Sequence, residues 1–210
     1  MKAQRCLGVL LAFGFLLTAP FARGQDEKKK APPPPPNYYP LQVGNEWNFR
    51  VTVGGNSVNA ISRIAKIETI DGKPLARLEA SLNGNIVATE HLRVTPEGVF
   101  RYRNNGQEIV PPICLLKFPA KSNSKWDGNI KVGAEQGKYF CEAKEANVEV
   151  PAGKFKALHV AIRLETKGQT VTTAYWFVPN IGFVRQTVDA GGMSILMELE
   201  KYTPGKSDKK

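Results

Sequence analysis

Histidine is scarce in this chain, and the short motifs in which enzymes place their reactive side chains are missing. Only His91 and His159 occur, both on the more polar parity of their segments, and no HExxH or other close pair of metal ligands is present. There is also no GxSxG elbow, no P-loop and no Rossmann glycine pattern. Glu198 and Glu200 stand at i, i+2, which is typical of one solvated strand face. We therefore expect no catalytic residue, no metal, no cofactor and no enzymatic activity.

Cysteine is nearly as rare, with three residues in the whole chain. Cys6 lies at the start of an apolar run, so Cys114 and Cys141 would be the only cysteines of an exported, processed protein. An oxidising compartment favours a disulfide between them, which could stabilise the fold by about 3 kcal/mol. Two separate buried thiols are the alternative, because sequence spacing does not show that their Cα atoms approach. The sequence has no CxxC motif, which argues against a redox-active thiol.

Long hydrophobic runs are absent except for one near the start, Cys6–Ala19. Two basic residues precede it, and the small residues Ala22 and Gly24 follow it, as in a secretory signal peptide. The run is too short to span a bilayer comfortably, which leaves an uncleaved membrane anchor as the weaker alternative. We expect residues 1–24 to be removed and the protein to be periplasmic or extracellular, with no integral membrane span after cleavage.

A clustered positive charge is also absent, although the formal charge is +10. The leader carries three of these charges, a charged, proline-rich tether (25–37) carries one, and a tail (204–210) that we expect to be disordered carries two, which leaves +4 for residues 38–203. These charges alternate singly along the chain instead of forming a basic stripe, so we expect no nucleic-acid partner. The five consecutive prolines of the tether favour an extended spacer.

Strand patterns fill the remaining chain, and no window has helical periodicity over three turns. The stretch 148–188 shows this best: Leu158, Val160 and Ile162 share one parity, and a Lys-Gly turn precedes another alternating segment. Asp-Gly and Asn-Gly pairs between such segments are hairpin signals. The sequence therefore predicts one all-β domain over 38–203. A large antiparallel meander forming a curved sheet or open half-barrel is the first choice, and a closed barrel or β-sandwich is the alternative.

Four segments together resemble a family of exported bacterial proteins of uncharacterised function that includes the DUF3108-like domains. They are YPLQVGNEW at 39–47, the loop from Pro119 to Trp126, the VPAGKF segment at 150–155, and the segment from Trp176 to Gly182. The likeness covers most of residues 39–200. It implies a curved antiparallel sheet similar to the lipoprotein-carrier folds of the bacterial envelope, and it implies no catalytic residue.

The one-sided apolar strands and this resemblance lead to one main hypothesis, a non-enzymatic envelope protein that binds an apolar ligand such as a lipid or acyl chain. Packing of the same side chains into a closed core is an equally weighted interpretation. A structural or interaction module that binds a protein partner or cell-wall polymer is the alternative function, with edge-strand pairing as a natural mode. The expected ligand-binding residues are Trp47, Val160, Ile162, Tyr175, Phe177, Met193 and Met197.

Overall fold

The computed structural model describes residues 36–206 of the chain. Within them the backbone forms strands and turns, which confirms the all-β antiparallel class, and it contains no helix that could cross a membrane. The predicted leader lies outside the described residues, as do most of the predicted tether and the end of the tail. The strands are β1 (Glu46–Val53), β2 (Asn56–Ile70), β3 (Lys73–Leu82), β4 (Asn85–Thr95), β5 (Gly98–Asn104), β6 (Gln107–Lys117), β7 (Lys125–Val132), β8 (Glu135–Val150), β9 (Gly153–Thr166), β10 (Gln169–Val178), β11 (Gly182–Ala190) and β12 (Met193–Thr203).

Tight turns form where Asp-Gly and Asn-Gly pairs occur in the sequence. Asp71 and Gly72, between β2 and β3, have φ angles of 50° and 71°. Asn83 and Gly84, between β3 and β4, have φ angles of 49° and 80°. Positive φ at both central residues is the type I′ arrangement, whose twist matches that of two paired strands. The hairpin turns predicted at these positions are confirmed. They were predictable because the backbone conformation of a tight turn depends on the turn residues themselves.

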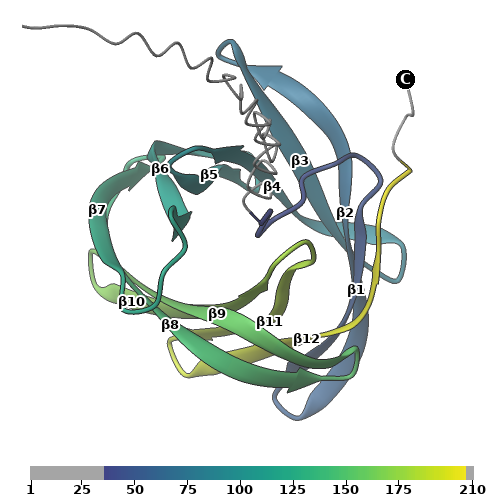
Figure 1. Cartoon of the computed structure of the whole chain (residues 1–210). Coiled ribbons are helices and arrows are strands. Elements are labelled where there is room, and N and C mark those ends of the chain that lie inside the picture. The colour runs from purple at the N-terminus through teal and green to yellow at the C-terminus, as the bar shows by residue number, and fades with distance from the viewer. Residues whose placement is uncertain (1–35, 207–210) are drawn as a thin grey trace, which may run out of the picture. The chain divides into compact units, whose positions relative to one another are not determined.

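The meander closes into a barrel, which is the alternative architecture of the sequence analysis and not its first choice. Each strand pairs with its sequence neighbours, and β1 pairs with β12 as well as with β2 along its whole length. The strands therefore follow one another around a ring (Figure 1). Closure removes the unpaired edges that an open sheet would leave exposed.

The pairing of β6 with β7 is the weak seam of this ring. These strands share only two residue pairs, Ile109 with Val132 and Val110 with Lys131. Pro111 and Pro112 follow on β6, and proline has no N–H group to continue a ladder. Beyond them a side chain bridges the strands, since Trp126 Nε1 donates to the Cys114 carbonyl at 2.9 Å. This Trp126 was expected in a loop, but it lies inside β7 and pairs with Cys141 of β8.

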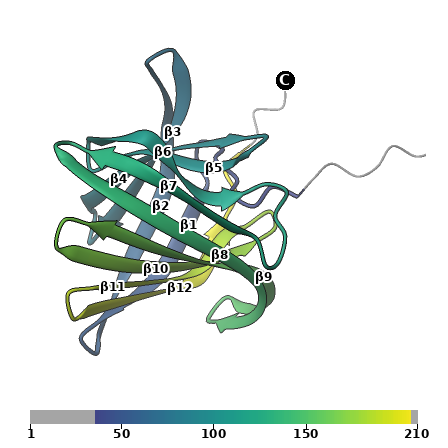
Figure 2. The same ribbon diagram turned by 90° about the vertical axis from the view of Figure 1, so that its left-hand side faces the viewer.

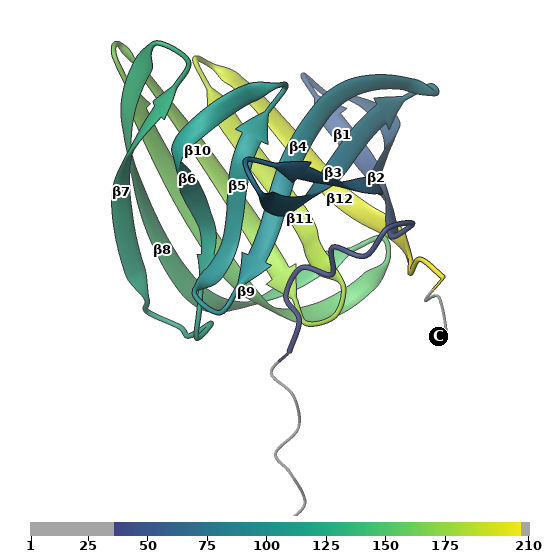
Figure 3. The same cartoon turned by 90° about the horizontal axis from the view of Figure 1, so that it is seen from above.

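Residues 36–45, here called the strap, cross one end of the barrel (Figure 3). Asn180 donates its backbone N–H to Asn37 at 2.7 Å, and Trp47 Nε1 donates to the Ile181 carbonyl at 2.6 Å. Asn45 accepts the Gly205 N–H at 2.7 Å, which ties the chain beyond β12 to the same place. We call this the strap end. Figure 2 shows the barrel from the side, with the β9–β10 and β11–β12 turns at the other end, the hairpin end.

Candidate functional site

A hydrogen bond across the barrel identifies which side chains face its interior. Arg101 of β5 donates from Nη2 to the Tyr175 hydroxyl of β10 at 2.9 Å. β9, β8, β7 and β6 separate these strands on one side of the ring, and six strands separate them on the other. Side chains of such distant strands can meet only through the interior. Because opposite residues in a ladder share a face, this bond fixes the inner face of every neighbouring strand.

Four polar side chains form a cluster on this inner face. Arg101 holds Glu90 with two hydrogen bonds, from Nε at 2.9 Å and from Nη2 at 3.0 Å. Gln186 Nε2 donates to the Tyr175 hydroxyl at 3.0 Å. Glu90 and Arg101 retain 23% and 18% of their side-chain surface, so water can reach an ion pair that lies inside the barrel. We call Glu90, Arg101, Tyr175 and Gln186 the polar cluster.

The charges of the polar cluster stabilise one another. Burial alone would lower the pKa of Arg101, but the Glu90 carboxylate and the Tyr175 hydroxyl raise it above its ordinary value. Burial raises the pKa of Tyr175, and the positive charge of Arg101 opposes that rise. Arg101 is therefore a permanent cation and Tyr175 a neutral hydroxyl at physiological pH.

An aromatic layer lies between the polar cluster and the strap end. Tyr39 of the strap makes edge contacts with Trp47, Phe177 and Phe183, at ring-centroid distances of 5.8, 6.2 and 5.9 Å. Tyr175 stacks on Phe177 at 5.4 Å, so one residue belongs both to this layer and to the polar cluster. Such aromatic contacts contribute about 0.5–1.5 kcal/mol each beyond their buried area. The layer covers the strap end of the interior beside β1, β10 and β11.

Tyr39 lies near the polar cluster, whose charges act on its hydroxyl. Burial raises the pKa of Tyr39 well above its usual value, and the nearby Glu90 carboxylate adds to the rise. The side chain is 97% buried, since 3% of the residue is exposed, and its hydroxyl has no hydrogen bond to any residue between 36 and 206. A tyrosine hydroxyl can both donate and accept, so this group can bond to a ligand atom that comes within reach.

Exposure of the inner face increases toward the hairpin end. Val53 opposite Ile195, and Val58 opposite Val51, lie on this face and are 38% and 48% exposed. Met193, on the inner face of β12, is 52% exposed. These three neighbouring strands therefore present apolar side chains to water at the hairpin end, where a packed core would cover them. Solvent reaches the inner face from this end, although Val94, on the inner face at the strap end of β4, is also 38% exposed.

The structure places all seven residues expected to bind a ligand on the inner face, at different depths. Met193 and Met197 lie on β12 toward the hairpin end, where Met193 is exposed and Met197 is partly buried. The other five are buried, and Tyr175 is the only one of the seven that belongs to the polar cluster. Val160 is completely buried in the packed part of the barrel. The buried five are Trp47, Val160, Ile162, Tyr175 and Phe177.

Sequence reasoning missed Glu90, Arg101 and Gln186. Glu90 lies opposite Leu78 and shares the face of Leu92, which is the pattern of an inward position. The register shifts after His91 and again after Val99, so the alternation breaks on both sides of the ion pair. Glu90 could have been recognised as an inward charged residue, because apolar residues precede and follow it on the same face of the strand. The β-bulges shift the alternation nearby and obscured this pattern.

The predicted disulfide is not formed. Cys114 and Cys141 are free and buried thiols. The Cys141 thiol points to the backbone carbonyl of Cys114 at 3.9 Å, whereas the Cys114 sulfur lies toward Gly98 of β5. The Cys141 thiol therefore contacts the backbone of Cys114 and not its sulfur atom, so the geometry of a disulfide is not met.

Both thiols are expected to resist alkylation in the folded protein. Burial raises the pKa of Cys114 to about 11, and burial with the nearby Cys114 raises that of Cys141 further. The reactive thiolate is therefore scarce at pH 8. Iodoacetamide followed by intact-mass measurement should label both cysteines in guanidinium chloride and neither in buffer. A native mass that lacks two hydrogens and takes no label after unfolding would show a disulfide instead.

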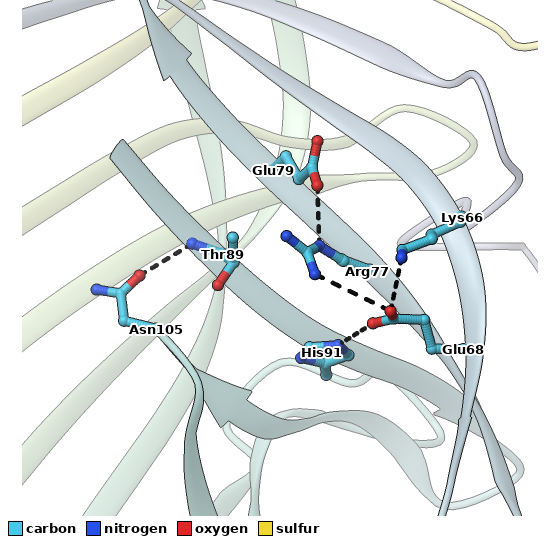
Figure 4. A network of polar contacts seen from close by, with 7 residues as sticks. All are labelled: Lys66, Glu68, Arg77, Glu79, Thr89, His91 and Asn105. Atoms are coloured by element: carbon cyan, nitrogen blue, oxygen red, sulfur yellow. Dashed lines mark hydrogen bonds and ion pairs between the residues drawn. The ribbon is translucent and has the colours of Figure 1, made fainter. Parts of the chain in front are cut away.

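Charged side chains on the outer face of β2, β3 and β4 form a separate network (Figure 4). Glu68 contacts Lys66 Nζ at 2.8 Å and His91 Nε2 at 2.6 Å, and Arg77 bonds Glu79 at 2.8 Å. Hydrogen bonds from Lys66 and then from His91 lower the pKa of Glu68 to about 2. His91 follows Glu90 in the strand and so points to the opposite face from the polar cluster. Between residues 36 and 206 no three potential metal ligands of this kind come together.

No known protein family and no curated protein matches the chain in sequence. Three solved structures resemble it. A candidate lipoprotein from Parabacteroides distasonis has 15% identity and a TM-score of 0.47 over 80% of this chain and 99% of its own. A candidate exported protein with a YmcC-like fold from Bacteroides fragilis has 14% identity and a TM-score of 0.49 over 80% and 100%. LprF from Mycobacterium bovis has 10% identity and a TM-score of 0.22 over 81% and 90%. Values this low transfer no function to the chain.

Proposed function

We propose that this is an exported, non-enzymatic protein that binds an apolar ligand, such as a lipid or acyl chain, on the inner face of its barrel. The ligand enters from the hairpin end and stops at the polar cluster. The observation that carries the proposal is the exposure of Val53, Val58 and Met193 on the inner face. Export is supported by the leader-type pattern at residues 1–24.

Exposed apolar side chains that cluster on one surface are typical of a binding site, where a ligand covers them. Burial of apolar surface contributes about 25 cal/mol per Å², so an acyl chain against these residues gains affinity without any charged contact. Met193 and Met197 suit such a face, because methionine adapts its shape to different apolar partners. Edge-strand pairing with a protein partner has less support, since the ring closes every edge except the β6–β7 seam.

Native mass spectrometry of the secreted protein, followed by organic extraction, tests the proposal directly. We expect a bound lipid mass, or uptake of added dodecane and 1-monolauroylglycerol by a protein that was isolated empty. A protein that stays free of every apolar probe would contradict the proposal.

A pair of neighbouring substitutions locates the binding. Met197→Trp fills the inner face opposite Val51 and should weaken dodecane uptake about tenfold or more, which corresponds to about 1.4 kcal/mol. Leu196→Trp is the control, because Leu196 follows the opposite parity and points outward from the same strand. Equal uptake by the two variants would place the ligand elsewhere. Val160→Trp is unsuitable here, since Val160 has no exposed surface and the larger ring would disrupt the core.

A further inference from the structure

The polar cluster has no net charge, and this determines which kind of ligand head group can bind to it. Arg101 contributes one positive charge and Glu90 one negative charge, at 2.9 Å. The other members of the cluster, Tyr175 and Gln186, are uncharged, and so is the Tyr39 hydroxyl beside them. The interior therefore offers hydrogen bonds but no net charge to a ligand that reaches it.

Binding an anionic head group at the polar cluster would cost desolvation free energy that binding a neutral head group does not. A carboxylate could pair with Arg101 only by sharing it with Glu90, which would leave two negative charges beside one positive charge. Removing an uncompensated charge from water is far more expensive than removing a hydroxyl or ester that finds a hydrogen-bond partner. The bidentate geometry of the Arg101–Glu90 contact makes exchange of the carboxylate harder still.

Suitable partners for a neutral head group are already in place. The Tyr39 hydroxyl can donate or accept, and it has no partner among residues 36–206. Gln186 donates through Nε2 to Tyr175, and no hydrogen bond within the described part of the chain uses its carbonyl oxygen. Arg101 donates through Nε and Nη2, and its Nη1 group makes no hydrogen bond to another side chain between residues 36 and 206. A hydroxyl or ester group at this position could satisfy a donor and an acceptor at once.

We infer that the polar cluster and Tyr39 receive the uncharged, oxygen-bearing head group of a neutral amphiphile, such as a monoacylglycerol, in preference to a fatty-acid anion. The inference rests on the proposed function, and it adds the class of ligand and the residues that recognise it. Glu90 is the specificity-determining residue, because its charge cancels that of Arg101. Tyr39 is the residue that gains a hydrogen bond on binding.

Two ligands with the same acyl chain test this inference in the wild-type protein. Calorimetric titration at pH 8 with 1-monolauroylglycerol and with laurate should give at least a tenfold lower Kd for the neutral compound. Equal or tighter binding of laurate would overturn the inference while leaving the proposed function intact. Dodecane serves as the reference, since failure of all three probes to bind would contradict the proposed function itself.

Substitutions then assign the preference to particular groups. Glu90→Gln leaves the charge of Arg101 unbalanced and should tighten laurate binding about tenfold or more, with little change for 1-monolauroylglycerol. Glu198→Gln is the matched control, because Glu198 is also a glutamate paired with arginine, in its case Arg50 and Arg185, but on the outer face. An unchanged laurate affinity in folded Glu90→Gln protein would exclude charge balance as the cause of the preference.

Tyr39→Phe keeps the aromatic layer and removes only the hydroxyl. It should weaken 1-monolauroylglycerol binding about fivefold and leave dodecane binding unchanged. Tyr38→Phe is its control, because Tyr38 is the adjacent strap residue and packs toward Phe118 at a centroid distance of 6.4 Å. Full affinity for 1-monolauroylglycerol in Tyr39→Phe would remove Tyr39 from the proposed site. Tyr39→Phe tests the role of Tyr39 in head-group binding even if Glu90→Gln does not fold.

Discussion

Replacing Arg101 with methionine is expected to lower the free energy of unfolding by about 3–5 kcal/mol at pH 7. The change leaves the Glu90 carboxylate inside the barrel without its two hydrogen bonds from Arg101, and it removes the bond to Tyr175 across the interior. A carboxylate that loses its only cation in a poorly solvated place is among the most destabilising single changes in proteins. Guanidinium chloride unfolding, followed by tryptophan fluorescence, measures the effect.

The control for this change is Arg185→Met. Arg185 also bonds a glutamate, Glu198, on the outer face, but there the carboxylate keeps a second arginine, Arg50 at 3.2 Å, so a smaller loss is expected. The double variant Glu90→Gln/Arg101→Met should recover most of the lost stability, since it leaves no unpaired charge. Wild-type stability in Arg101→Met would show that the ion pair contributes little to the fold.

The stability deficit of Arg101→Met should also depend on pH. Without its cation, a buried carboxyl has a raised pKa in the folded state, so folding favours its protonated form. Such a carboxyl increasingly destabilises the folded protein as the pH rises. At low pH, where it is protonated in both the folded and the unfolded protein, it no longer affects stability. The deficit relative to wild type should therefore be largest near neutrality and shrink as the pH falls toward about 4, the ordinary range of a glutamate.

Removal of the Trp47 side chain is expected to have the second large effect, about 3–5 kcal/mol for Trp47→Ala. Trp47 is 2% exposed, contacts Tyr39 of the strap and stacks on Tyr202 at 5.4 Å. Its Nε1 also donates to the Ile181 carbonyl, so the change opens a cavity and breaks the link between β1 and the β10–β11 turn. Thermal and denaturant unfolding should both report the loss.

Trp176→Ala is the matched control, because it removes the same side chain from the outer face. Trp176 is partly buried there against His159 and Arg185. A loss of about 1 kcal/mol is expected, which is the centre of the range for single substitutions. Comparable losses for the two tryptophans would contradict the placement of Trp47 in the buried aromatic layer at the strap end.

Local features of this protein were predictable from the sequence because they depend on neighbouring residues. Strand alternation in β9 and β10, and the turns at Asp71-Gly72 and Asn83-Gly84, follow from the two-residue repeat of a strand and the φ angles that turn residues adopt. The same alternation placed Val160, Tyr175 and Met197 on one face.

Predictions failed or shifted where the chain departs from strict alternation. β2 carries a β-bulge after Ile64, which changes the phase of its alternation. Trp126 was expected in a loop because Pro119 and the polar residues after it suggested a turn, yet β7 begins at Lys125. The disulfide was inferred from compartment and number of cysteines, which carry no information about the direction of the two sulfur atoms.

Closure of the ring and the composition of the interior were decided by the tertiary structure alone. β1 and β12 pair although they stand at opposite ends of the domain, and Arg101 meets Tyr175 across 74 positions of sequence. Alternation tells which residues share a face, but it does not tell whether that face is concave, closed or filled. The sequence by itself determined the strands, the turns and the apolar face. Only folding brought Glu90, Arg101, Tyr175 and Gln186 together, because long-range pairing places distant strands opposite one another within the barrel.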